Sequence, residues 1–143
     1  AAAATPPRRR FDLVFIDGLH ESSQVIRDVQ NALLFLNPNG TILLHDCKPI
    51  FEVEGSFPYV PGTCFWNGNV WKAIALLRTL PDIDVCVGDF DWGLGIVRRR
   101  PNSNPLIGIS SLEQIDWRLY EARQAELLNI KDFKGIHDWL HLG

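Results

Sequence analysis

The sequence predicts an α/β fold in which a mixed β-sheet has helices on both faces. Three observations support this prediction. Residues 11–16 and 41–44 are short apolar runs typical of buried parallel strands, and an amphipathic segment separates them. Residues 83–87 and 94–98 are two further apolar runs joined by a short connector, which is typical of an antiparallel hairpin. The 143 residues have the length of one domain.

The first predicted strand, Phe11–Ile16, is apolar except for Asp12, and we expect it to be buried on both faces. Apolar side chains then recur at helical spacing over residues 25–36, which predicts an amphipathic helix lying on the sheet. Residues 37–40, with the sequence Asn-Pro-Asn-Gly, are expected to end this helix and turn the chain. Residues 41–44 then form a second strand, parallel and adjacent to the first through a right-handed crossover.

A long loop is predicted over residues 47–68, which are rich in Pro, Gly and aromatic side chains. Compact domains rarely carry so long a loop without a use, so we interpret it as a lid over a site at the strand ends. An apolar stripe at helical spacing predicts a helix over residues 70–80, before the hairpin.

The end of the chain, residues 101–143, predicts a helical extension. Ser110 and Glu113 have the spacing of a capping box ahead of a helix that reaches about residue 129, and a last helix is expected over residues 133–140. The predicted organisation is therefore a disordered or edge-covering segment (residues 1–10), a partial α/β domain (residues 11–100) and this extension.

Composition excludes several classes of partner. The net charge is −3, and the only basic runs are two Arg triplets, Arg8 to Arg10 and Arg98 to Arg100, which we interpret as solvated strand ends rather than a nucleic-acid surface. No apolar run approaches the roughly 20 residues that a membrane span needs. Three cysteines without Cys-x-x-Cys spacing favour a reduced, cytoplasmic setting.

The candidate chemistry lies at Asp17, His20 and Asp46, which follow the first two strands. Because neighbouring parallel strands end at the same edge of a sheet, Asp17 and Asp46 should lie a few ångströms apart. Two carboxylates so placed can hold Mg²⁺, which would lower the pKa of a substrate hydroxyl. His20 is then a candidate general base for the proton of that hydroxyl.

A structural alternative exists for the same residues. Asp17 and His20 could cap the loop and the next helix, and Asp46 could accept hydrogen bonds from backbone amides. We expect His45 to be packed or hydrogen-bonded rather than a ligand. Trp66, Trp71 and Trp92 are expected to be aromatic residues of the core or of the lid, and a platform for the substrate is the alternative.

Five segments carry a resemblance to a known family: Phe15-Ile16-Asp17-Gly18-x-His20, Leu43-Leu44-His45-Asp46, Asn67-Gly68-x-Val70-Trp71-Lys72-Ala73-Ile74, Asp91-Trp92-Gly93-Leu94-Gly95 and Glu126-Leu127-Leu128-Asn129. In this order they resemble the second half of a class I methyltransferase that uses S-adenosylmethionine, in a bacterial branch associated with O-methylation of sugars and natural products. The resemblance implies a partial Rossmann-like fold with a four-stranded mixed sheet, ordered fourth, fifth, seventh, sixth in the family's numbering.

The resemblance also implies roles for individual residues. Asp17, Gly18 and Leu19 would contact S-adenosylmethionine, Asp17 and Asp46 would bind a metal such as Mg²⁺, and His20, Asp17 and Asp46 would be catalytic. The chain departs from the family where a Gly-rich turn and an acidic residue normally hold the cofactor, because neither has a counterpart here. We therefore expect the chain to be the C-terminal portion of an O-methyltransferase that acts on a sugar or another small molecule. This portion lacks the cofactor-binding half and is expected to be inactive by itself. The alternative is a non-catalytic binding or assembly module.

One further expectation concerns association. In the family the strand that corresponds to Phe11–Ile16 pairs with a strand that has no counterpart here, so this apolar strand would lie at an open sheet edge. Open edges tend to pair with another chain. We expect a homodimer through this strand, or an edge covered by residues 1–10 or by the C-terminal helices.

Overall fold

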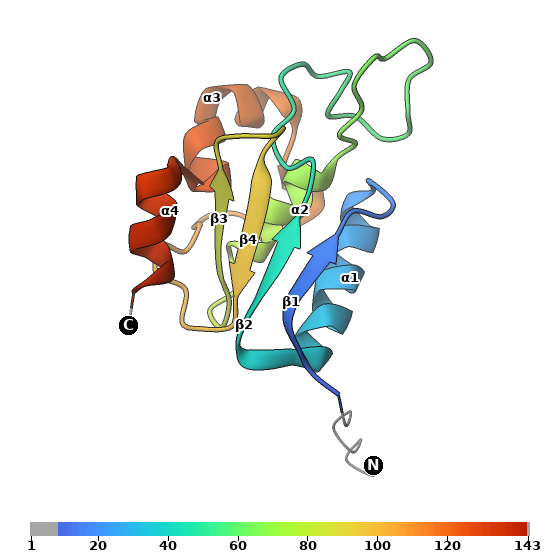
Figure 1. Cartoon of the computed structure of the whole chain (residues 1–143). Coiled ribbons are helices and arrows are strands. Elements are labelled where there is room, and N and C mark those ends of the chain that lie inside the picture. Colours follow the sequence, from blue (N-terminus) through green and yellow to red (C-terminus); the bar gives the residue numbers. More distant parts are fainter. Residues whose placement is uncertain (1–8, 143) are drawn as a thin grey trace.

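The computed structural model describes residues 9–142 as a mixed five-stranded sheet with helices on both faces (Figure 1). Most of the predicted N-terminal segment, residues 1–8, lies outside the described residues. The strands are β1 (Phe11–Ile16), β2 (Leu36–Leu44), β3 (Asp84–Gly88), β4 (Leu94–Arg98) and β5 (Ile130–Lys131). The helices are α1 (Ser22–Phe35), α2 (Val70–Leu77), the short 3₁₀ helix η1 (Leu112–Gln114), α3 (Trp117–Leu128) and α4 (Phe133–Leu140).

The sheet order is β1-β2-β4-β3-β5. β1 and β2 are parallel, whereas β4 is antiparallel to both β2 and β3. The predicted fold class and strand order are confirmed, with one correction: the short β5 adds a fifth strand parallel to β3. β5 forms because Asn129 ends α3 in the left-handed conformation, with φ 50°, and turns the chain back along β3.

The helices divide the core into two unequal parts. α1, α2 and α3 lie on one face of the sheet and enclose the larger cluster, whereas α4 covers the other face over β3 and β4 (Figure 1). The smaller cluster under α4 contains Cys86, Ile96, Ile136 and Trp139. None of the described helices is both long enough and apolar enough to cross a membrane.

β1 corrects the expectation of a strand buried on both faces. Val14 and Ile16 pack against the main core beneath α1, but Leu13 and Phe15 are 58% and 56% exposed. The reason lies in the tertiary structure. On the face of the sheet away from α1, α4 covers only β3 and β4, and β1 is the edge strand at the other end of the sheet (Figure 1). The hydrophobic run predicted a strand correctly but did not show which of its faces would be covered.

The predicted turn at residues 37–40 is also modified. α1 ends at Phe35 and β2 begins at once, so these residues lie within β2. Leu36 pairs with Phe11, yet the next residue pair is Thr41 with Leu13. Residues 37–40 of β2 thus lie opposite the single residue Asp12 of β1, which is a bulge that accommodates the Pro and Gly.

The start of the C-terminal helix differs from the prediction as well. The capping box forms at Ser111 and Gln114 and belongs to η1, not to a long helix. α3 begins later, at Trp117, where the Asp116 side chain accepts a hydrogen bond of 2.8 Å from the Leu119 amide. Ile115, fully buried and extended, separates the two helices.

Arg100 is not the solvated strand end that we expected. Its Nε lies 2.9 Å from Oδ2 of Asp84, whose side chain is fully buried in β3. The guanidinium also lies 4.3 Å above the ring of Trp139 and donates to its backbone carbonyl. Arg100 thus joins the sheet to α4, because the buried carboxylate requires a charged partner.

The three cysteines differ in accessibility, which leads to a first prediction. Burial raises the pKa of the Cys86 thiol to about 12 and raises that of Cys47 well above its ordinary value, whereas Cys64 is exposed. Because the thiolate is the nucleophile, we expect iodoacetamide at pH 8 to modify only Cys64 in the native protein, as checked by peptide mass spectrometry. Cys64→Ser should leave the native protein unlabelled, and equally fast labelling of Cys86 would contradict the described burial.

Candidate functional site

Asp17, His20 and Asp46 meet at one edge of the sheet. Asp17 directly follows β1 and Asp46 follows β2 by two residues, and both strands end at the same edge because they are parallel. His20 Nε2 lies 3.3 Å from Asp17 Oδ1 and 3.5 Å from Asp46 Oδ2. One ligand atom from each residue lies within 4.8 Å of the other two. The structure therefore brings together the three residues that the sequence singles out, while their roles stay predictions.

The orientation of His20 determines what it offers to this cluster. Its Nδ1 lies 3.1 Å from the Trp66 carbonyl oxygen, and its ring stacks on the Trp66 indole with centroids 5.2 Å apart. A carbonyl oxygen only accepts, so Nδ1 carries the hydrogen. In the neutral ring, Nε2 then turns its lone pair toward two carboxylates. Such a convergence of lone pairs is stabilised by a cation at its centre, either a proton on Nε2 or a metal ion.

Asp46 is held in an unusual conformation. Its φ is 60°, in the left-handed region that few non-glycine residues adopt. Its Oδ1 accepts a 2.8 Å hydrogen bond from Nδ2 of Asn67, which is 1% exposed. The amide oxygen of the same Asn67 side chain is buried and has no hydrogen-bond partner among the described residues. Two carboxylates, an imidazole nitrogen and an orphaned amide oxygen make a donor set that fits a divalent cation.

His45 extends the cluster toward the β3–β4 turn. Its Nδ1 lies 3.1 Å from Asp46 Oδ2 and its Nε2 lies 3.1 Å from Asp91 Oδ2. Burial of the ring opposes protonation, but the hydrogen bond to Asp91 and the charge of Asp46 outweigh it, so the pKa of His45 lies above its ordinary value. His45 is thus hydrogen-bonded, as expected, and its partner Asp91 was not predicted.

The capping alternative does not describe His20 or Asp46. α1 is capped by Glu21, whose carboxylate accepts from the Ser23 and Gln24 amides at 3.1 and 2.9 Å. Within residues 9–142, no backbone amide donates to the Asp46 carboxylate; its hydrogen-bond donor is the Asn67 side chain. Neither side chain therefore caps a helix or a strand end.

Gly18 and Leu19, the other predicted cofactor contacts, lie in the turn between β1 and α1. Both are exposed, Leu19 to 53%. The hollow that they line beside His20 has a volume of only about 10 Å³. A ligand the size of a nucleoside would lie on the open surface of the described residues, because ligand pockets are roughly 300–1,000 Å³.

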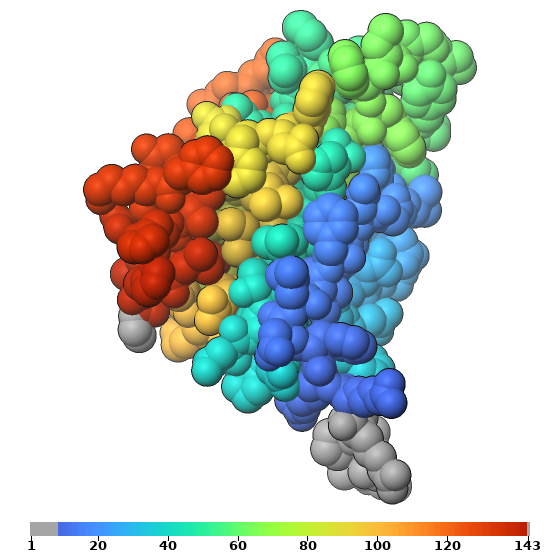
Figure 2. All heavy atoms as spheres, in the orientation of Figure 1, coloured from blue at the N-terminus to red at the C-terminus, as the bar shows by residue number. Residues whose placement is uncertain are grey.

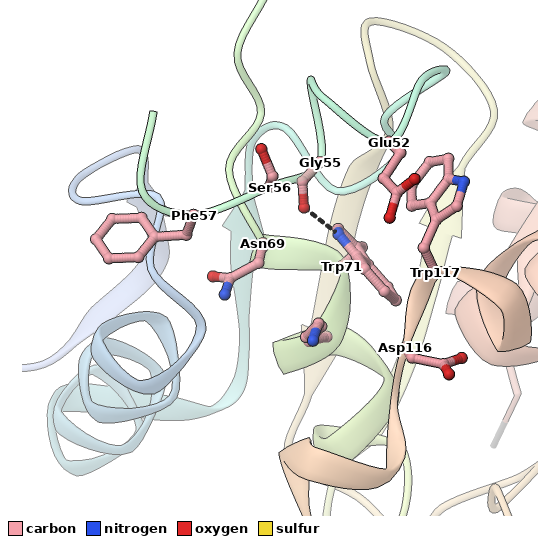
Figure 3. Close-up of a pocket in the computed structure, with 9 residues that line it drawn as sticks. Glu52, Gly55, Ser56, Phe57, Asn69, Trp71, Asp116 and Trp117 are labelled. Atoms are coloured by element: carbon pink, nitrogen blue, oxygen red, sulfur yellow. Dashed lines mark hydrogen bonds between the residues drawn. The ribbon is translucent and has the colours of Figure 1, made fainter. Parts of the chain in front are cut away.

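A larger cavity of about 280 Å³ lies beneath the 47–68 loop, and the sequence did not predict it (Figure 3). The loop, the start of α2 and the start of α3 each contribute to its lining: Glu52, Gly55, Ser56, Phe57, Asn69, Trp71, Lys72, Asp116 and Trp117. Trp71 donates a 2.7 Å hydrogen bond to the Gly55 carbonyl and so holds the loop on α2 (Figure 3). Phe57 also stacks on Trp66, the residue that covers His20.

Gly68 connects this loop to the site, which gives a second prediction. Gly68 has a φ of +61°, and a Cβ there would lie 2.0 Å from the His20 carbonyl oxygen. Gly62, with φ +94°, has no neighbouring atom within 4 Å of such a Cβ. Gly68→Ala should therefore reduce the free energy of unfolding by about 1–3 kcal/mol more than Gly62→Ala, which incurs only the backbone cost. Equal urea midpoints for the two variants would show that Gly68 does not touch His20.

Comparison with known proteins identifies one similarity. Residues 1–47 match the sequence model of a methyltransferase domain. No curated protein matches the chain, and no solved structure does. The match spans β1, α1 and β2 together with Asp17, His20 and Asp46. The part of the chain that carries all three candidate residues is thus methyltransferase-like.

Proposed function

We propose that this chain is part of an S-adenosylmethionine-dependent O-methyltransferase and that Asp17, His20 and Asp46 lie at its reaction centre. The observation that carries the proposal is the convergence of these three side chains within a methyltransferase-like segment. The proposed acceptor is a hydroxyl group of a sugar or another small molecule, the class that the sequence resemblance implies. The described residues have no Gly-rich turn for the cofactor, so its tight binding needs further residues.

Asp17 and Asp46 would hold Mg²⁺, with the buried oxygen of Asn67 as a further donor nearby. When bound, the metal would lower the pKa of the acceptor hydroxyl, and S-adenosylmethionine would supply the methyl group. His20 has the orientation of a base, because Nδ1 lies against the Trp66 carbonyl and Nε2 faces the two carboxylates, where a bound metal would stand in for a proton on Nε2. The hydroxyl proton would pass to Nε2 as the acceptor oxygen bonds to the methyl carbon and the carbon–sulfur bond breaks.

Metal binding is the first test. We expect calorimetric titration of Mg²⁺ to show a site that Asp17→Asn and Asp46→Asn each weaken at least about tenfold, as loss of one ligand does. Asp82→Asn, which removes an exposed carboxylate from the turn before β3, is the matched control and should leave binding unchanged. His20→Asn should retain Mg²⁺ because the ion prefers oxygen ligands. A loss as large as that of the Asp variants would make His20 a ligand instead of a base.

Cofactor binding is the second test, with S-adenosylmethionine titrated into the folded chain with and without Mg²⁺. Saturable binding would support a cofactor site within the chain. Binding of Mg²⁺ without S-adenosylmethionine would support the metal centre alone and assign the cofactor contacts to residues elsewhere. The absence of both in a sample that is folded by circular dichroism would contradict the proposal.

A further inference from the structure

A second cavity, of about 240 Å³, lies at the same edge of the sheet as the candidate site, and we call it the hairpin cavity. Lys48 and Ile50, which follow β2, form one side, and residues 89–93 of the β3–β4 turn form the other. Figure 2 shows this turn, in yellow, at the surface between the red α4 and the blue-green start of the loop. The cavity is smaller than the roughly 300–1,000 Å³ of pockets for drug-sized ligands, so it suits a molecule with a single ring.

Asp91 connects the hairpin cavity to the candidate site. Its side chain lines the cavity, and its Oδ2 lies 3.1 Å from Nε2 of His45. The other nitrogen of the same ring, Nδ1, lies 3.1 Å from Oδ2 of Asp46. A ligand that contacts Asp91 would therefore be separated from the Asp46 carboxylate by one imidazole ring.

The backbone that carries Asp91 and Trp92 is strained. Their φ angles are 49° and 54°, in the left-handed region that few non-glycine residues adopt, and Gly93 follows with a φ of 85°. The Lys48 amide donates a 2.7 Å hydrogen bond to the Trp92 carbonyl, and the Cys47 amide donates one of 3.0 Å to the Gly93 carbonyl. The chain after β2 thus holds the turn in this conformation. Strain that is sustained by its surroundings is typical of ligand sites.

Trp92 gives the hairpin cavity an exposed aromatic surface. The residue is 38% exposed, and Phe65 packs on its ring from outside the cavity, with ring centroids 5.0 Å apart. Phe90 adds further apolar surface and is held by its stack on Phe133 of α4, with centroids 4.6 Å apart. The C–H groups of a ligand ring would therefore find an apolar surface to pack on.

Charged side chains provide the polar part of the lining. Nζ of Lys48 pairs with Oδ1 of Asp89, and the side chains of Asp89 and Asp91 are 51% and 65% exposed. An ammonium group only donates and a carboxylate only accepts, so together they match hydroxyl groups, which do both. Two carboxylates and one ammonium group leave an excess of negative charge, which disfavours an anionic ligand.

We propose that the hairpin cavity binds an uncharged pyranose and is the subsite for the methyl acceptor. The pyranose would pack one face on Trp92 and bond its hydroxyl groups to Asp89, Asp91 and Lys48. A flat aromatic acceptor would use Trp92 equally well, but it would desolvate the charged groups without pairing them. The role as acceptor subsite rests on the proposed function, whereas binding of the pyranose requires neither the cofactor nor the metal.

Saturation-transfer NMR on the chain tests the ligand class. The probes are methyl α-D-glucopyranoside, methyl α-D-galactopyranoside, methyl α-L-rhamnopyranoside, catechol and glucuronate. We expect at least one methyl glycoside to receive saturation, mainly at the C–H groups of one ring face, and to bind more tightly than catechol or glucuronate. Tighter binding of catechol or glucuronate, or no binding of any glycoside to the folded chain, would overturn the proposal.

Substitutions test whether the glycoside lies on the turn. Trp92→Ala should raise its dissociation constant at least about tenfold, whereas Trp92→Phe, which keeps a ring, should retain most of the affinity. Asp91→Asn should raise the dissociation constant about fivefold through loss of a charged acceptor. Phe35→Ala is the matched control, because Phe35 is an aromatic residue of similar exposure, 41%, at the end of α1 and the opposite edge of the sheet. Glycoside binding that Trp92→Ala leaves unchanged, in a variant folded by circular dichroism, would contradict the assignment.

The Mg²⁺ titration distinguishes failure of this proposal from failure of the proposed function. Glycoside binding that depends on Trp92, in a chain that does not bind Mg²⁺, would support the pyranose site and contradict the metal centre alone. Mg²⁺ binding that depends on Asp17 and Asp46, without glycoside binding, would support the metal centre and overturn the pyranose site.

Discussion

Substitution of Trp71 by alanine is expected to lower the free energy of unfolding by about 3–5 kcal/mol, a large share of the roughly 5–15 kcal/mol of a typical domain. Trp71 is 2% exposed, and its ring lies 4.7 Å from that of Tyr120 and 5.8 Å from that of Trp117, both in α3. Its loss would leave a cavity between α2 and α3 and would release the Gly55 carbonyl of the loop. Urea denaturation followed by circular dichroism measures the change.

Two further variants separate packing from hydrogen bonding at Trp71. Trp71→Phe keeps an aromatic ring but removes the donor to Gly55, so it should cost about 1–3 kcal/mol. Trp92→Ala, at a position 38% exposed, is the control and should cost less than either. If Trp71→Ala and Trp92→Ala had similar unfolding midpoints, the loop and α3 would not be anchored on α2 as described.

Replacement of Arg78 by alanine is expected to cost a similar amount, about 3–5 kcal/mol. Arg78 lies at the end of α2 and is 1% exposed. Its guanidinium donates to the carbonyl oxygens of Glu126, Leu127 and Asn104. Burial lowers the pKa of Arg78 from its ordinary value, yet a guanidinium with an ordinary pKa above about 12 remains charged at neutral pH.

Arg78 therefore serves as a cap for the last turn of α3: it donates to the Leu127 carbonyl and is a second donor, beside the Asn129 amide, to the Glu126 carbonyl. Arg78→Lys tests this directly, because lysine keeps the charge but not the planar fork that reaches three acceptors. We expect it to recover only part of the stability that alanine loses, as measured by thermal unfolding. Full recovery would show that the charge alone matters, and no loss in either variant would contradict the described network.

Much of the site was predictable because its residues lie at strand ends. The position of Asp17 after one apolar run and of Asp46 after the next was enough to place them at a common edge, since parallel neighbours leave a sheet on the same side. Asn67 and Asp91 were not predicted. They reach the cluster from the long loop and from the hairpin turn, where no periodic pattern relates a residue to its position in space.

Local patterns also misplaced elements where a tertiary contact opposed them. The spacing of Ser110 and Glu113 was that of a capping box, but the helix begins at Trp117, because burial of Ile115 in the core holds the intervening backbone extended. Arg100 belonged to a charged run typical of solvated chain, yet it pairs with the buried Asp84. The core around Ile115 and the Asp84 partner of Arg100 are both formed by segments too distant in the sequence for a local pattern to reveal.

The sequence by itself determined the α/β class and the residues at the strand ends, because hydrophobic periodicity and crossover handedness act over short stretches of chain. The strand order followed from the resemblance to the methyltransferase family. Only the tertiary structure decided which face of β1 remains open, how His20 is oriented by Trp66, and that a cavity lies beneath the loop. These features depend on contacts between segments distant in sequence. They are set by packing and by the partners of buried polar groups, which no local pattern encodes.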